Sequence, residues 1–325
     1  MFAIRRILVA VKDPVARSQP AVVKAAQIAR ALGARLELFH AITAPLYADL
    51  YREGDGGWRD IEKKTQAEVC KRLASIAHRL LRGGLVEVAA EWDFPVYEAV
   101  VRHAHRTKAD LLVAERHAGR HIAPWLLHLN DWELLRLSPI PVLLVKRSGA
   151  YRHPVILAAV DPTHADKPAK LDGVILRVGA AVCDSLRGTL HVLHAHASVL
   201  SGTRATDAFS PDRAERINSE FVAAAKVRLD RLLRSTTIPR KRRHLSGRRP
   251  VEAIQETVRI THSDIVVMGA VSRSGLKRLF IGNTAESLLD ELACDLLIVK
   301  PHGFVNRVPA TGRGTRVIPL TPVFP

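Results

Sequence analysis

The stretch 269–284 has the residue types of a phosphate-binding loop. Gly269 follows a short apolar segment, and Gly282 precedes Asn283 and Thr284, which can begin a helix. Glycines allow backbone N–H groups to approach an anion closely, and the unpaired N–H groups and dipole of a helix N-terminus favour a phosphate. The same residue types are also common in ordinary turns and helix caps. The spacing therefore predicts either an anion site or a plain strand–turn–helix connection.

The elements that would position this loop alternate between strands and helices, and the pattern occurs twice. Residues 110–146 align without a gap to residues 264–300, and apolar residues coincide at most strand positions. In the first half we expect strands at 7–11, 36–40, 85–90, 111–114 and 142–145, and helices at 18–31, 59–82, 96–105 and 131–137. Ser18 is suited to cap the first helix and Gly33 to end it.

The second half repeats this order. We expect strands at 155–160, 190–193, 240–245, 265–268 and 296–299, and helices at 166–187, 212–234, 251–261 and 283–292. Such alternation predicts a parallel sheet with helices on both faces. The fold class is therefore α/β, with tandem five-stranded domains over 1–150 and 151–302. Residues 303–325 contain Gly, Pro, Thr and Arg but no acids, which predicts a flexible basic tail.

The loop also carries a pattern that resembles the universal stress protein family: Gly, two residues, Gly, nine residues, Gly, then Ser or Thr. Ser272 stands at the second position of this pattern, and Asn283 followed by Thr284 stands at the last. Over about residues 4–301 the chain is similar to the tandem-domain, E-type members of the family. The resemblance implies flavodoxin-like, adenine-nucleotide α-hydrolase-like domains. It also implies that the two halves pair as an intrachain pseudo-dimer, and it leaves a homodimer open.

The resemblance implies a stress-resistance protein that binds ATP or another adenine nucleotide, or a different small anionic ligand, without a metal. Asp161 and Ala195 match family positions on the nucleoside side. The residues expected around the phosphates are Gly269, Ser272, Gly282, Asn283 and Thr284. Ser272 adds bulk where a glycine is usual and Asn283 removes a hydroxyl, so ATP itself is less favoured than an anion in general.

The first half has lost the pattern. The equivalent positions hold Glu115, Ala118, His128 and Leu129. A carboxylate repels phosphate, and larger side chains would fill the space for it. We expect this half to be a scaffold or to bind something less anionic.

A basic run is the main alternative signal. The formal net charge is +17, and residues 240–249 include Arg240, Lys241, Arg242, Arg243, Arg248 and Arg249. One interpretation is a basic adaptor that binds nucleic acid or acidic protein partners without a small ligand. The other is an edge strand that Lys and Arg protect against unwanted pairing, and the sequence favours this second interpretation because aromatic stacking residues are lacking beside the run.

Other chemistry receives less support. Two histidine pairs, His117 with His121 and His194 with His196, have spacings that place both rings on one face, but no carboxylate or cysteine stands at a familiar ligand spacing beside them. No Walker lysine motif or nucleophile elbow occurs, so we expect a binding protein and not an enzyme, with weak ATPase activity left open. Three scattered cysteines and the lack of a membrane-length apolar run predict a cytoplasmic protein.

Overall fold

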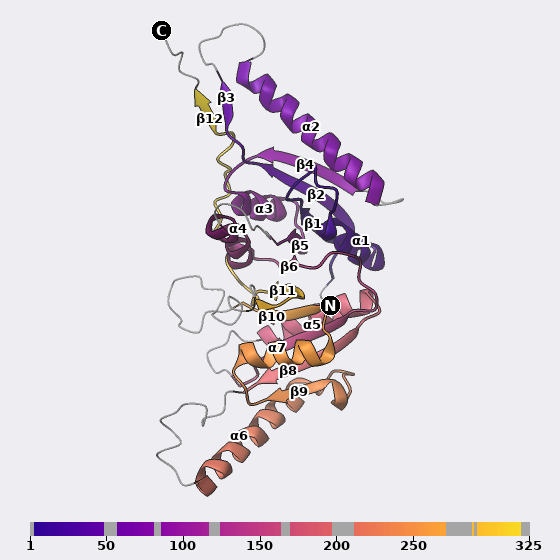
Figure 1. The fold of residues 1–325 in the computed structure, drawn as a ribbon, viewed down its shortest axis with the longest axis vertical. Helices are drawn as coiled ribbons and strands as arrows, with labels where there is room; N and C mark the ends of the chain where they lie inside the picture. The colour runs from indigo at the N-terminus through magenta and orange to yellow at the C-terminus, as the bar shows by residue number, and fades with distance from the viewer. Residues whose placement is uncertain are drawn as a thin grey trace. The chain divides into compact units, whose positions relative to one another are not determined.

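The computed structural model of the chain describes residues 3–48, 57–80, 86–116, 124–163, 170–196, 211–270, 288 and 291–319 (Figure 1). The chain divides into two compact units. The first-half unit comprises Ala3–Ala150 together with Val305–Pro325, and the second-half unit comprises Tyr151–Phe304. Each unit is an α/β fold built on parallel strands, as the alternating pattern predicts.

The sheet of the first-half unit has the order β4-β2-β1-β5-β6. Its strands are β1 (Arg6–Ala10), β2 (Arg35–Ile42), β4 (Val86–Trp92), β5 (Leu111–Glu115) and β6 (Val142–Val145). Every recorded pairing among them is parallel. Apart from Arg6 and Glu115 at their ends, strands β1, β5 and β6 are aliphatic and have no exposed position, which is the pattern of a parallel sheet covered on both faces.

The helices of this unit are α1 (Pro20–Leu32), α2 (Gly57–Leu80), α3 (Val96–Arg106) and α4 (Pro124–Leu137). Gly33 ends α1 in the left-handed conformation with φ 63°, as predicted. The predicted cap at Ser18 is wrong: Gln19 is the N-cap and makes no side-chain capping bond. Pro20 at the start of the helix supplies a pre-set φ, and the Gln19 amide instead donates to the backbone oxygens of Asp13 and Ala16.

The first-half unit also contains a short parallel pair that the sequence pattern does not predict. Strand β3 (Leu46–Ala48) pairs with β12 (Val317–Pro319), so a segment from the C-terminal end of the chain adds to the first-half unit. Figure 1 shows this segment, in yellow, running beside β3. Residues 305–319 therefore have a defined course against this unit, where the sequence predicts a flexible tail.

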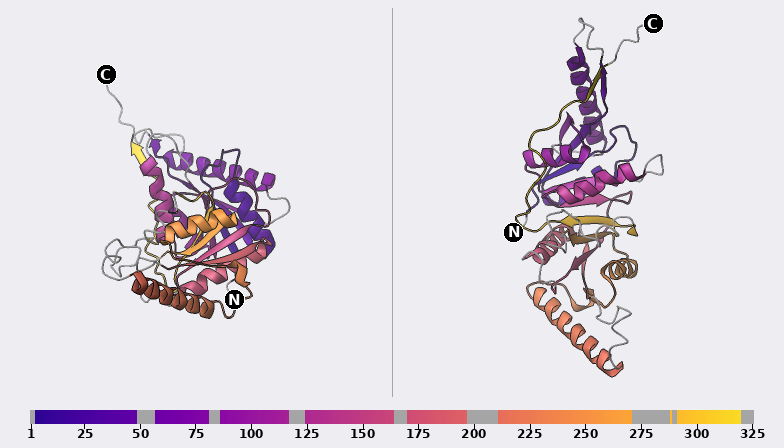
Figure 2. Two further views of the ribbon diagram at one scale, coloured as in Figure 1. Left: turned by 60° about the horizontal axis from the view of Figure 1, so that its bottom comes forward. Right: turned by 90° about the vertical axis from the view of Figure 1, so that its left-hand side faces the viewer.

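The second-half unit repeats the arrangement with the order β11-β10-β7-β8-β9. Its strands are β7 (Val155–Val160), β8 (Thr189–Ala195), β9 (Arg243–Ser246), β10 (Ile265–Gly269) and β11 (Asp295–Val299). Its helices are α5 (Leu171–Ser185), α6 (Pro211–Leu232), the short 3₁₀ helix η3 (Arg240–Arg242) and α7 (Pro250–Thr261). Helices α5 and α7 lie on opposite faces of this sheet (Figure 2). Most of the helix predicted at 283–292 lies outside the described residues.

The strand order determines where a ligand site can form. In both units the first strand lies at the centre of the sheet. The next two strands are added on one side of it, and the last two strands are added on its other side. Open α/β sheets bind ligands where this reversal occurs, outside the carboxyl ends of the two central strands. In the second-half unit those strands are β7 and β10, which pair directly.

Candidate functional site

Three of the predicted site residues lie at neighbouring strand ends on the carboxyl edge of the second-half sheet. Asp161 follows β7, Ala195 is the last residue of β8, and Gly269 is the last residue of β10. In register, β7 pairs Val160 with His194 and Ala159 with Met268. The three residues therefore lie at equivalent levels on adjacent strands, at the reversal point of the sheet.

Asp161 is fixed by its own turn. Its backbone N–H donates to Oδ1 of Asp172, in the first turn of α5, at 3.0 Å. Its side-chain Oδ1 accepts from the Thr163 hydroxyl at 2.8 Å and from the Thr163 N–H at 3.3 Å. The side chain remains 36% exposed, so the carboxylate is oriented by the turn and is also reachable from solvent.

Gly269 is required by packing. A Cβ built on residue 269 would lie 2.7 Å from Cδ2 of Leu171 and 3.3 Å from Cδ1 of Ile175. Both of these side chains belong to α5, and both are buried. The glycine therefore allows α5 to lie close against the end of β10, which the sequence pattern alone does not distinguish from a role in anion binding.

Two histidines also lie at this strand end, His194 and His196, whose spacing in the sequence suggests only a pair of metal ligands. His194 is fully buried, and its Nδ1 lies 3.3 Å from the backbone oxygen of Val160. Because a carbonyl only accepts hydrogen bonds, Nδ1 carries the proton, and Nε2 is left as an acceptor. Burial lowers the pKa of His194, as it does that of His196, so both rings are neutral near pH 7.

The two rings present buried nitrogens without partners in the described part of the chain. These atoms are His194 Nε2 and His196 Nδ1, and the ring centroids are 6.3 Å apart. A buried polar atom without a hydrogen bond costs free energy, on the order of 1–3 kcal/mol. The pattern HAH after an apolar strand is the sequence signal for this pair, because alternation along the strand places both rings on one face.

The remaining predicted residues fall elsewhere. Ser272, Gly282, Asn283 and Thr284 lie outside the described residues, so their predicted place around a phosphate stays a prediction. In the first half, Glu115 ends β5 at the position equivalent to Gly269, and His128 and Leu129 fall within α4. Ala118 lies outside the described residues.

One feature of the site is duplicated in the first-half unit. His40, in β2, places Nδ1 2.8 Å from the backbone oxygen of Val11, and burial lowers its pKa. This is the same arrangement as that of His194 with Val160. The equivalent histidines thus fix the ends of neighbouring strands in both units.

The basic run makes contacts within its own unit. Strand β9 is at the edge of the second-half sheet, as predicted. The strand predicted at 240–245 is wrong in its first half, because Arg240–Arg242 form η3 and β9 begins at Arg243. Arg243 donates to the backbone oxygen of Ile238 at 2.7 Å and lies 3.2 Å from Asp230. Arg248 pairs with Glu256 at 2.8 Å, and Arg249 pairs with Glu252. Arg240 and Lys241 are exposed.

The described residues give little support to other kinds of site. Within the described ranges, no three His, Cys, Asp or Glu side chains gather as ligands for a metal ion. None of the described helices has both the length and the apolar character that a membrane crossing needs. The three cysteines, Cys70, Cys183 and Cys294, are free.

Comparison with known proteins gives a consistent result. The sequence model of the universal stress protein family matches residues 3–146 and again residues 155–300. Universal stress protein E of Salmonella typhi is 27% identical over 320 residues, which cover 94% of this chain and 98% of that protein. The protein of the same name from Escherichia coli K12 is 26% identical with the same coverage.

Solved structures show the same fold. A functionally unknown protein from Pseudomonas aeruginosa PAO1 superposes with a TM-score of 0.65 at 23% identity, covering 92% of this chain and 93% of that chain. A universal stress protein from Archaeoglobus fulgidus superposes with a TM-score of 0.58 at 15% identity, covering 92% and 97%.

Proposed function

Because the chain belongs to the universal stress protein family, with two tandem copies of its domain, we propose that it serves the stress response by binding a nucleotide or another small anionic ligand in its second half. The family supports the stress-response role. The ligand, the site and the absence of catalysis are our proposal.

The observation that carries this proposal is the gathering of hydrogen-bonding groups at the reversal point of the second-half sheet. The Asp161 carboxylate, the Ala195 backbone and the two neutral imidazoles all lie at adjacent strand ends. Buried His194 Nε2 and His196 Nδ1 lack partners among the described residues, and a ligand that forms hydrogen bonds with these two nitrogens would satisfy them.

The chemistry of these groups favours the nucleoside part of an adenine nucleotide. The Asp161 carboxylate and His194 Nε2 are acceptors, and they match donors such as ribose hydroxyls and an exocyclic amino group. The proposed phosphate contacts are Gly269, Ser272, Gly282, Asn283 and Thr284, on the family resemblance. ATP and other adenine nucleotides are the ligands we propose first, with no metal assigned.

We propose binding without catalysis, in the cytoplasm. The sequence has no Walker lysine motif and no nucleophile elbow. Free thiols are typical of a reducing compartment. The intrachain pseudo-dimer and a homodimer stay predictions from the resemblance.

The basic-adaptor alternative receives less support from the contacts of the basic run. Arg243, Arg248 and Arg249 are paired with acids or a carbonyl of their own unit. An arginine already paired in this way contributes less to a phosphate backbone, and the edge position of β9 gives the run a structural reason.

Calorimetric titration of the full chain with ATP, ADP and AMP tests the proposal. We expect about one site per chain. Asp161→Ala should weaken binding about tenfold or more, as expected when a hydrogen bond to a charged group is lost. Asp13→Ala is the matched control, since Asp13 follows the first strand of the first half and should leave the affinity unchanged.

Equal loss in both variants would contradict a site in the second half. Binding that is unaffected by Asp161→Ala would contradict the assigned nucleoside contact. Salt-dependent binding of duplex DNA that disappears when residues 240–243 are neutralised, with no nucleotide bound, would favour the basic adaptor.

A further inference from the structure

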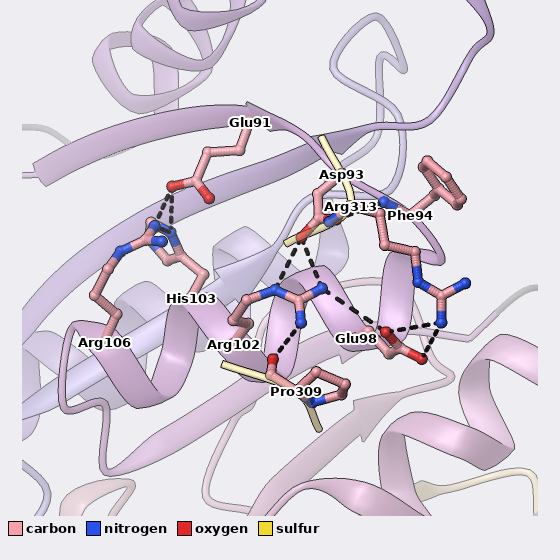
Figure 3. A network of polar contacts seen from close by, with 9 residues as sticks. All are labelled: Glu91, Asp93, Phe94, Glu98, Arg102, His103, Arg106, Pro309 and Arg313. Carbon is pink, nitrogen blue, oxygen red and sulfur yellow. Dashed lines mark hydrogen bonds and ion pairs between the residues drawn. The ribbon is translucent and has the colours of Figure 1, made fainter. Parts of the chain in front are cut away.

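The C-terminal segment, residues 305–319, lies on the first-half unit through contacts that a featureless tail would not make. It follows Gly303, which has φ 81°, and ends in β12 beside β3. Between these points it passes Asp93, which follows β4, and Glu98 and Arg102 of α3 (Figure 3). We name Glu62, Asp93, Glu98 and Arg102 the acidic docking site.

The segment covers a cluster of buried acidic and basic side chains in this site. Asp93 and Glu98 are 5% and 8% exposed with the segment in place, beside the single guanidinium of Arg102, a residue that is 7% exposed. Arg102 donates to Oδ2 of Asp93 from Nε at 3.0 Å and from Nη2 at 2.8 Å, and lies 3.8 Å from Glu98. These three side chains thus set two acids against one base, and a buried acid that lacks a basic partner is costly.

Arg313 of the segment supplies a second basic partner. Its Nη2 lies 3.0 Å and 3.3 Å from the two carboxylate oxygens of Glu98. Its backbone N–H donates to Oδ1 of Asp93 at 2.8 Å. Figure 3 shows the Arg313 side chain reaching Glu98 while Arg102 lies between Asp93 and Glu98. One residue thus satisfies both acids, through its main chain and its side chain.

The residues on either side of Arg313 also contact the site closely. A Cβ on Gly312 would lie 2.9 Å from Oδ2 and 3.2 Å from Cγ of Asp93, so a larger residue before the arginine would displace the Asp93 carboxylate. The guanidiniums of Arg313 and Arg316 lie 5.6 Å and 4.6 Å from the centroid of the Phe94 ring, within cation–π range.

Further polar contacts fix the register on either side. Arg102 donates from Nη1 to the backbone oxygen of Pro309, and the Thr315 hydroxyl donates to Glu62. The Leu46 N–H then donates to the backbone oxygen of Arg316 at 2.8 Å, and β12 continues as a parallel strand on β3. Adding an extended strand while side chains engage specific contacts is a known mode of peptide recognition.

The segment docks with little side-chain burial. Among residues 305–318, Val308 is the one buried side chain, at 8% exposure, and the Arg313 side chain is 51% exposed. The segment is therefore held by ionic and main-chain contacts and not by burial in the core.

We propose that the acidic docking site is a peptide-binding site for an extended Gly–Arg segment, and that residues 305–319 are its tethered occupant, which a second copy of the same segment can replace. Tethering gives the chain's own segment a high effective concentration, so it fills the site unless it is weakened. This proposal is independent of the ligand proposed for the second half.

The test uses full-length chains and a labelled synthetic peptide with the sequence of residues 305–320. In the variant Arg313→Glu, amide hydrogen exchange over 305–319 should accelerate about tenfold or more, as expected for loss of a charge-assisted contact. This variant should then bind the peptide, and the unaltered chain should bind it at least about tenfold more weakly because its own segment occupies the site. A peptide carrying Arg313→Glu should not bind.

Two further variants place the effect at the site. Glu98→Gln should accelerate exchange over 305–319 and weaken peptide binding in the Arg313→Glu chain, whereas Glu68→Gln, the same change at an exposed position of α2, should do neither. Circular dichroism melting confirms that each variant is folded. If Arg313→Glu does not fold, Arg313→Lys replaces it, with a smaller increase in exchange expected from loss of the two-oxygen contact.

Three results would overturn the proposal. The first is unchanged exchange over 305–319 in every Arg313 variant. The second is a folded Arg313→Glu chain with an exposed segment that does not bind the peptide. The third is equal binding of the native and Arg313→Glu peptides, which would show that the arginine is not recognised.

Discussion

Leu171 leaves no room for a side chain on Gly269: a Cβ there would lie 2.7 Å from Cδ2 of Leu171. Gly269 is also the first glycine of the motif by which the phosphate-binding loop is recognised. Its presence in the sequence therefore follows from helix–strand packing, whether or not a ligand binds. Evidence for the ligand must come from the groups that packing does not explain, chiefly His194, His196 and Asp161.

Replacing Gly269 tests the packing role. Gly269→Ala should lower the free energy of unfolding by about 1–3 kcal/mol, because an added methyl in a filled space forces its neighbours to move. Thermal and denaturant unfolding measure this change. Gly179→Ala is the matched control: its Cβ would meet neighbours at 3.6 Å or more, inside helix α5, so it should be neutral or stabilising. Equal effects of the two substitutions would contradict the packing argument.

His103 should stabilise the first-half unit below neutral pH. Its Nδ1 lies 2.9 Å from Glu91 and its Nε2 2.7 Å from Glu37. Burial opposes its charged form, but the hydrogen bonds and charges of the two carboxylates outweigh burial and raise the pKa of His103 above its ordinary value of 6.5. The stabilisation is thus fully present below pH 6.5 and is lost as the pH rises through the raised value.

The partners of His103 set the acid limit of this window. Burial alone would raise the pKa of Glu37 and of Glu91, but the hydrogen bond and charge of His103, with nearby arginines, lower both pKa values below 4.5. His103→Gln should lower the free energy of unfolding by about 3 kcal/mol between these limits, as for one partner of a buried ion pair. Unfolding at a series of pH values checks this, and a loss that is the same at pH 5 and pH 9 would contradict it.

A second histidine pair should respond to pH with the opposite sign. Nδ1 of His191 lies 2.8 Å from Nε2 of His244, and the rings stack with centroids 5.2 Å apart. Burial lowers both pKa values, and for His191 the neighbouring His244 and Arg242 lower it further. The stabilisation is present above pH 6.5 and is lost as the pH falls toward the lowered values. Nuclear magnetic resonance titration should show these two rings titrating below pH 6.5 and His103 above it; a reversed order would contradict both assignments.

Tyr151 should resist ionisation in the folded chain. Its hydroxyl donates to Oδ2 of Asp295 at 2.5 Å. Burial, followed by the charge of Asp295, raises the pKa of Tyr151 well above 10. Tyr151 ionises near pH 10 in the unfolded chain but stays protonated at that pH in the folded chain. The free energy of unfolding should therefore fall above pH 10. Phenolate absorbance measures this: the Tyr151 contribution should appear only on unfolding, and Tyr151→Phe should remove it.

The sequence predicts most regular elements because their patterns are local. Strand β7 begins and ends at the predicted residues. Gly33 ends its helix as predicted, because the left-handed backbone conformation at that position depends only on the residue itself and its neighbours in the chain. The docked C-terminal segment shows the opposite case. Its Gly, Pro and Arg content is typical of a flexible tail, and its course depends on buried acids at 93 and 98, more than two hundred residues away in the chain.

The candidate site divides in the same way. Asp161, Ala195 and Gly269 can be placed at strand ends from alternation alone. The burial of the His194 and His196 nitrogens that lack partners within the described ranges depends on the packing around each ring, which a single sequence does not specify. Prediction from sequence thus locates the edge of the sheet but not the groups that make it suitable for a ligand.

The most direct test of the central claim is to purify the chain from its own cells, denature it, and identify the released small molecules by mass spectrometry. We expect an adenine nucleotide at about one per chain from the unaltered protein and little from Gly282→Val, which places a side chain in the proposed phosphate loop. Release of no nucleotide or other small anion, together with no calorimetric binding of ATP, ADP or AMP, would contradict the proposed function.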